Sequence, residues 1–146
     1  MTNLDDTRSY KLDSSHMGAE IAGLPDQLEN AFKTFSAIAI PTHYVQCRNV
    51  LILGMGGSAI GGELAATLAQ DSSSVPIEVR RDYDIPAYVS KDTLVIGVSY
   101  SGNTEETLRG FQQAAARGAK LLVIASGGEL SSLARKFKAP IFAIDY

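Results

Sequence analysis

The sequence has few of the residues that mark extracellular, membrane or metal-binding proteins. Its 146 residues include a single cysteine, Cys47. One cysteine excludes an internal disulfide and a Cys-x-x-Cys metal motif, and it is typical of a reducing compartment. No apolar run approaches the roughly 20 residues that span a bilayer. The first residues are acidic where a signal peptide would be basic and then apolar, so we expect a cytoplasmic protein.

Charge is also sparse, and neither sign is concentrated in one segment. The chain has 13 Lys and Arg residues and 16 Asp and Glu residues, which gives a formal net charge of −3 at pH 7. A basic run that would bind a nucleic-acid backbone or an anionic membrane is absent, so we expect neither as a partner. The hydrophobic content of 45% and the length are those of a globular domain with a substantial core.

Two hydrophobic patterns divide the chain. After Pro25 the apolar residues recur at spacings of three and four, which predicts a helical arm over residues 1–40. From residue 41 short unbroken apolar runs alternate with helical stretches, which predicts a domain over residues 41–146. Its predicted fold is a three-layer α/β/α sandwich around a five-stranded parallel sheet. The expected strands are 50–53, 75–79, 94–98, 120–125 and 140–144, and the expected helices are 14–22, one from Pro25, 59–69, 104–117 and 129–137.

Two turns rich in glycine and hydroxyl side chains carry the candidate chemistry. The first runs from Gly54 to Ser58 after the first expected strand of the sheet, and the second runs from Ser99 to Thr104 after the third. In a parallel sheet both turns lie at the carboxyl edge, where ligands bind. Each turn starts a helix, whose free N–H groups and positive dipole end attract an anion. The residues predicted to hold a phosphate are Gly56, Gly57, Ser58, Ser99, Ser101 and Thr104.

The first turn also permits a nucleotide interpretation. Gly54–Ala59 matches the G-x-G-x-x-(G/A) dinucleotide fingerprint, and Glu78 lies near the position of a ribose-binding acid. However, Glu78 falls inside an expected strand, and a nicotinamide site does not need a second hydroxyl-rich turn. A Walker A loop is excluded, because its Gly-Lys-Ser/Thr ending is missing.

Each residue of the turns has a purely structural alternative. Ser58 and Thr104 could cap their helices, and Asn103 with Glu106 has the spacing of a capping box. Tyr100 could line the site or pack into the core. These alternatives stay open at this point.

The two turns together resemble the signatures of a known family. Gly54–Gly62 and Ser99–Thr107 are similar to the two motifs of sugar isomerase (SIS) domains, and more narrowly to those of bifunctional phosphoglucose/phosphomannose isomerases. Arg81–Pro86 and the helix start Leu24–Gln27 are similar to that family too. The resemblance implies an SIS fold in which the six residues named above bind phosphate. It implies an isomerase that interconverts glucose 6-phosphate or mannose 6-phosphate with fructose 6-phosphate through an enediol, without a metal or a nucleotide cofactor.

The resemblance does not assign catalytic residues to this chain. These isomerases are longer and carry two SIS domains in tandem, with their general base and ring-opening residues beyond the last residue of this chain. We therefore leave the catalytic residues unknown and expect a hexose 6-phosphate and a second SIS domain as partners. The face that would meet that second domain could make the chain a homodimer. A non-catalytic SIS domain that senses a phosphosugar is the alternative function.

Overall fold

The computed structural model describes residues 13–144, and the chain divides into two compact units between Ala37 and Ile38. Residues 1–12 of the predicted arm and residues 145–146 of the predicted domain lie outside the described part. None of the helices within residues 13–144 has the length and apolar character that crossing a membrane requires.

The first unit contains α1 (Met17–Ala22) and α2 (Leu24–Ser36). α1 begins three residues later than predicted, because the Asp13 carboxylate accepts hydrogen bonds from Met17 N at 2.6 Å and Gly18 N at 2.8 Å. These bonds satisfy N–H groups that a helix start leaves free. Pro25 lies in the first turn of α2, as predicted.

The second unit is built on a five-stranded, all-parallel sheet with the strand order β2-β1-β3-β4-β5. Each predicted apolar run forms a strand, which confirms the predicted fold class. β2 lies at an edge of the sheet, where the missing N–H of Pro76 breaks no ladder. The strands are β1 (Asn49–Leu53), β2 (Ile77–Arg80), β3 (Thr93–Ser99), β4 (Lys120–Ala125) and β5 (Ile141–Ala143).

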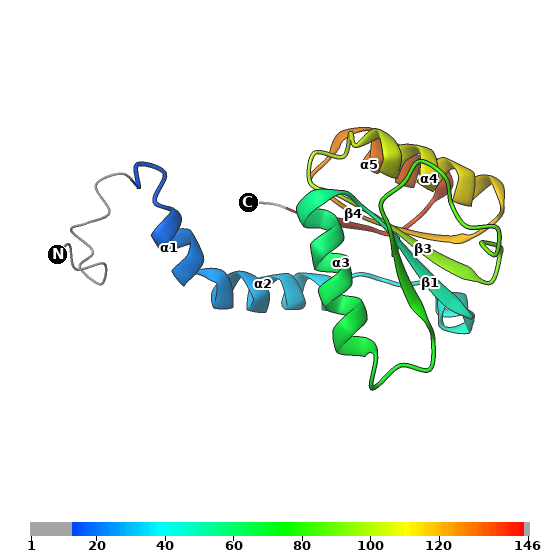
Figure 1. Ribbon diagram of the computed structural model, residues 1–146, viewed down its shortest axis with the longest axis horizontal. Coiled ribbons are helices and arrows are strands. Elements are labelled where there is room, and N and C mark those ends of the chain that lie inside the picture. Colours follow the sequence, from blue (N-terminus) through cyan, green and yellow to red (C-terminus); the bar gives the residue numbers. More distant parts are fainter. Residues whose placement is uncertain (1–12, 145–146) are drawn as a thin grey trace. The chain divides into compact units, whose positions relative to one another are not determined.

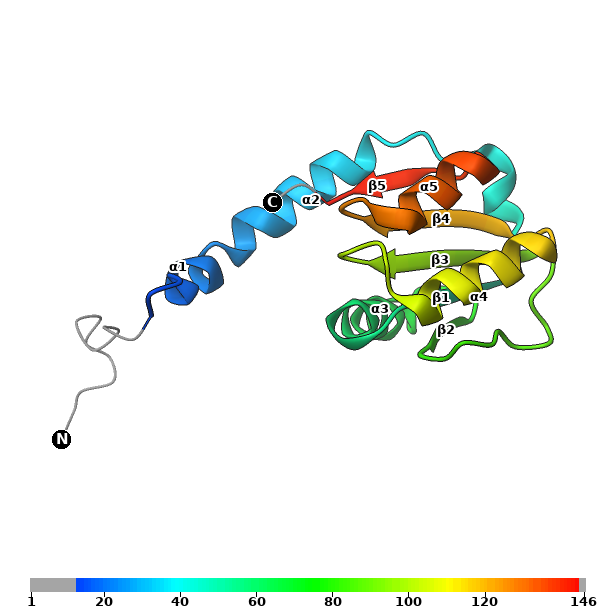
Figure 2. The ribbon, with the colours of Figure 1, turned by 90° about the horizontal axis from the view of Figure 1, so that it is seen from above.

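Three helices cover the two faces of this sheet unequally. α4 and α5 lie side by side on one face, whereas α3 lies on the other, over β1 and β2 (Figures 1 and 2). The helices are α3 (Gly56–Ala69), α4 (Glu105–Ala116) and α5 (Gly128–Phe137). A short 3-10 helix, η2 (Thr42–Gln46), precedes β1 and was not predicted.

The core of the second unit lies between the sheet and the pair α4 and α5. Burial alternates along β3, because successive side chains of a strand point to opposite faces. The α3 face is less protected: Ile96, Val98 and Ile124 remain half-buried there. Within this unit the face under α4 and α5 is therefore buried, whereas the face under α3 is only partly covered. The largest fully buried apolar side chains are Phe111, Leu51, Leu53, Leu130, Val95 and Val123.

Candidate functional site

The two hydroxyl-rich turns lie next to each other at the carboxyl edge of the sheet. β1 pairs with β2 on one side and with β3 on the other, so the connections after β1 and β3 leave in opposite directions. This is the switch point of an open α/β sheet, where such folds bind their ligands. The first turn packs closely against the end of β3, since a Cβ placed on Gly54 would lie 3.2 Å from the Val98 carbonyl oxygen.

The first turn leaves the start of α3 open. α3 begins at Gly56 rather than at the predicted Ala59, and Gly56 adopts a φ of +51°. Among the described residues no side chain caps this helix, and the N–H groups of Gly56 and Gly57 have no hydrogen-bond partner. A Cβ on either glycine would meet nothing within 4 Å. Ser58 lies inside the first helical turn, so its predicted alternative role as the N-cap is wrong.

In the second turn the two serines have different environments. Ser99 is only 2% exposed, and its Oγ accepts a hydrogen bond from Gly102 N at 3.1 Å and shares one with Thr104 Oγ1 at 2.9 Å. Ser101 is exposed, and its Oγ accepts a hydrogen bond from Asn103 N at 3.2 Å. Ser101 therefore presents a hydroxyl to solvent, whereas Ser99 holds the turn together from inside.

The start of α4 also lacks a side-chain cap. Thr104 is its N-cap residue, but the side chain makes no capping bond and instead contacts Ser99. The predicted capping box of Asn103 and Glu106 is wrong, because Asn103 Oδ1 accepts a hydrogen bond from Glu129 N in α5 at 3.0 Å. The first turn of α4 consequently keeps its N–H groups and its positive dipole end free for a ligand.

Two carboxylates in the first turn of α4 oppose an anion, and one of them is engaged elsewhere. Glu105 Oε2 accepts a hydrogen bond from the Tyr83 hydroxyl at 3.4 Å. The negative charge of Glu106, followed by burial and the charge of Glu105, raises the pKa of Tyr83 above its usual value. The Tyr83 hydroxyl thus keeps its proton at neutral pH and remains a donor to Glu105.

A groove of about 620 Å³ opens beside Ser58, between α3 and the half-buried face of the sheet. Tyr100 is 60% exposed and lines this groove, so it is not a core residue. Sequence reasoning did not find the groove, because it results from the incomplete cover of one face. Apart from Ser58 and Tyr100 its side chains are apolar, and they offer few partners for sugar hydroxyls. The apolar lining includes Ile52, Met55, Ile96, Val98, Ile124 and Ile144.

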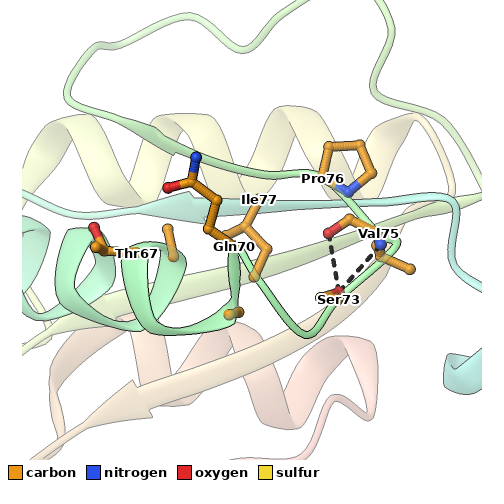
Figure 3. Close-up of a pocket in the computed structure, with 8 residues that line it drawn as sticks. Thr67, Gln70, Ser73, Val75, Pro76 and Ile77 are labelled. Carbon is orange, nitrogen blue, oxygen red and sulfur yellow. Dashed lines mark hydrogen bonds between the residues drawn. The ribbon is translucent and has the colours of Figure 1, made fainter.

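Another hollow, of about 360 Å³, lies at the opposite edge of the sheet, between the end of α3 and the start of β2 (Figure 3). Its hydroxyl from Ser73 is used locally, since Ser73 Oγ bonds to the backbone of Val75. This hollow is separated from the two turns by the length of the strands. No group of three His, Cys, Asp or Glu residues within 13–144 is arranged to hold a metal ion.

The position of Glu78 argues against the nucleotide interpretation. Glu78 lies inside β2, opposite Leu51, and its Oε2 accepts a hydrogen bond from the Tyr88 hydroxyl at 2.7 Å. A carboxylate at this position is not at the carboxyl end of its strand, where a ribose would bind.

The sheet order and the switch point are those of open α/β domains, which bind their ligands at the carboxyl edge of the sheet. Residues 43–144 match the SIS domain family, and the chain belongs to this family. This match confirms the resemblance to SIS domains that the two turns indicated.

Several curated relatives are named bifunctional phosphoglucose/phosphomannose isomerase. The protein from Caldicellulosiruptor bescii is 44% identical over 120 residues, which are 82% of this chain and 35% of that protein. The protein from Aquifex aeolicus is 37% identical over 118 residues, which are 80% of this chain and 37% of that protein. The match thus spans little more than a third of the length of these two relatives.

A solved structure shows the same fold. The Vibrio vulnificus NanR protein complexed with ManNAc-6P superposes with a TM-score of 0.63 at 19% identity, over 89% of this chain and 53% of that protein.

Proposed function

We propose that this chain binds the phosphate group of hexose 6-phosphates and is the phosphosugar-binding part of a phosphoglucose/phosphomannose isomerase. The observation that carries this proposal is the pair of uncapped helix starts, α3 and α4, at adjoining strand ends of the switch point. Such helix starts hold anions with backbone N–H groups and the helix dipole. The names of the relatives favour an isomerase over a sensor of phosphosugars.

The six predicted residues divide into two roles in this proposal. The donors to the phosphate oxygens are the backbone N–H groups of Gly56 and Gly57 and the hydroxyls of Ser58, Ser101 and Thr104. Ser99 is buried and acts indirectly, because it orients Thr104 through the 2.9 Å hydrogen bond between their hydroxyls. Neutral donors of this kind bind a phosphate without the desolvation of a Lys or Arg side chain.

The reaction itself requires groups from outside this chain. An aldose–ketose isomerase moves a proton between adjacent carbons and needs a base within hydrogen-bond reach of them. We propose that a second SIS domain supplies that base and completes the sugar site, and that the chain can also pair with a second copy of itself. We further propose a cytoplasmic location and keep the division into an arm, 1–40, and a domain, 41–146.

Thermal unfolding with and without ligand tests the proposal. A ligand at 100 times its dissociation constant stabilises the folded state by about 2.7 kcal/mol, so fructose 6-phosphate should raise the melting temperature. Fructose, which lacks the phosphate, and NAD serve as controls and should leave it unchanged. Stabilisation by NAD without stabilisation by fructose 6-phosphate would overturn the proposed function.

A further inference from the structure

Asn103 lies within the second hydroxyl-rich turn, but its side chain reaches the turn after β4. Its Oδ1 accepts a hydrogen bond from Glu129 N at 3.0 Å, and its Nδ2 donates to the Ser101 carbonyl oxygen at 3.1 Å. These partners fix the orientation of the amide group, because the Glu129 N–H can only donate and the carbonyl can only accept. Asn103 thereby connects Ser101, which is proposed to bind the phosphate, with a helix that starts far along the chain.

The main chain of Asn103 also orients the hydroxyl group of Ser101. Asn103 N donates a hydrogen bond to Ser101 Oγ at 3.2 Å. Because Oγ accepts this bond on the side of the turn, its own proton remains available for a ligand. The terminal oxygens of a phosphate group accept hydrogen bonds, so a serine held in this way suits a phosphate.

The same turn closes the start of α5. Glu129 N donates to Asn103 Oδ1, and Leu130 N donates to the Gly102 carbonyl oxygen at 2.9 Å. These are two of the N–H groups that a helix start leaves without a partner. The start of α5 is therefore an anchor for the turn, whereas the starts of α3 and α4 remain free for a ligand.

The backbones of the second turn and of the turn after β4 are in direct contact. A Cβ on Gly102 would lie 1.9 Å from the Gly127 carbonyl oxygen. A Cβ on Gly128 would lie 2.5 Å from the Ser101 carbonyl oxygen and 2.8 Å from Asn103 Oδ1. The second turn is therefore tightly packed against the turn after β4, in addition to its hydrogen bonds with the start of α5.

We propose that Asn103 is a positioning residue for phosphate binding, which acts through Ser101 by fastening the second turn to the start of α5. The inference rests on the proposed function, in which that turn binds the phosphate. Asn103 itself does not contact the phosphate in this scheme. Its contribution to binding is the fixed geometry of the turn before the ligand arrives.

Asn103→Ala tests this role, with Ala134→Gly as a matched control. The first variant removes both side-chain bonds, whereas the second weakens α5 at a buried position of its helix by loss of helix propensity and packing. Both should lower the urea midpoint of unfolding. Only Asn103→Ala should weaken the binding of fructose 6-phosphate, by about tenfold in isothermal titration calorimetry, which corresponds to about 1.4 kcal/mol.

Unchanged affinity of Asn103→Ala would overturn the inference. So would an equal loss of affinity in both variants, since it would reflect a weakened α5 rather than a fastened turn. If the wild-type chain does not bind fructose 6-phosphate, the proposed function fails and the inference fails with it. Normal binding by the wild-type chain and by Asn103→Ala removes the inference alone.

Hydrogen exchange on the wild-type chain gives a second measurement that does not depend on a variant that folds. Coupling between binding and fastening is reciprocal, so saturating fructose 6-phosphate should slow exchange of the Glu129 amide. The Ser73 amide, which bonds to the Ala69 carbonyl oxygen at 2.8 Å near the opposite edge, should exchange at an unchanged rate. Equal exchange at Glu129 with and without bound ligand would overturn the inference.

Discussion

Among the glycines, Gly102 is the one at which an added Cβ would come closest to a neighbouring atom. Gly102 has a φ of +69°, and a Cβ there would lie 1.9 Å from the Gly127 carbonyl oxygen and 2.7 Å from its carbon. Gly118, which follows α4, offers a matched control. Its φ is +72°, almost the same, but a Cβ there would meet nothing within 4 Å.

The two substitutions to alanine separate backbone strain from steric overlap. Left-handed backbone costs an L-residue about 1–2 kcal/mol, and the reduced freedom of the unfolded chain offsets about 0.4–1 kcal/mol of this. Gly118→Ala should therefore destabilise the fold by about 1 kcal/mol. Gly102→Ala carries the same terms plus the displacement of a backbone, for which overpacking typically costs about 1–3 kcal/mol. Its total loss should be about 2–4 kcal/mol.

Urea unfolding followed by circular dichroism measures both losses. In a chain of this size 1 kcal/mol corresponds to about 4 °C, so melting temperatures should differ by about 4–12 °C between the variants. Equal destabilisation of Gly102→Ala and Gly118→Ala would refute the reasoning, since it would mean that the second turn and the turn after β4 are not in contact. Fructose 6-phosphate affinity should fall only in Gly102→Ala, because only that substitution displaces the proposed site.

Two further predictions concern residues outside the site. Tyr44→Phe removes a buried hydroxyl that donates to the Leu121 carbonyl oxygen at 2.8 Å and accepts from Leu121 N at 3.3 Å. The free energy of unfolding in urea should therefore fall by about 1–3 kcal/mol. An unchanged urea midpoint would contradict this prediction. A hydrogen bond from Gln113 and the charge of Arg109 lower the pKa of Asp84 in the folded state. The Asp84 carboxylate therefore stabilises the fold at a pH above its unfolded pKa. This contribution is lost as the pH falls through the lower folded pKa. Gln113→Ala should raise the Asp84 pKa toward its usual value in an NMR titration, and an unshifted titration would count against the assigned cause.

The strands of the sheet, but not their order, could be predicted from local patterns. The run Leu121–Ala125 is continuously apolar, which is typical of a strand in a parallel sheet, and β4 has the predicted bounds 120–125. The start of α3 was missed for an equally local reason. Gly56 and Gly57 have low helix propensity, but a first turn needs no internal N–H bonds and tolerates them.

The role of Asn103 could not be predicted, because its partner is distant in sequence. Sequence spacing suggested Glu106, three residues further on, whereas the observed partner Glu129 belongs to another helix. Capping across tertiary contacts has no fixed spacing. The difference in burial between Ser99 and Ser101 could have been predicted more easily. Ser99 continues the buried alternation of β3 after Val95 and Gly97.

Calorimetric titration of three chains with fructose 6-phosphate tests the central claim most directly. Ser101→Ala removes an exposed hydroxyl at the proposed phosphate site, and Ser73→Ala removes one at the opposite edge of the sheet. A hydrogen bond to a charged group contributes about 1.5–3 kcal/mol, so Ser101→Ala should bind about 10- to 100-fold more weakly than the wild-type chain, and Ser73→Ala should bind like it. Equal affinity in all three chains would contradict a phosphate site at this turn.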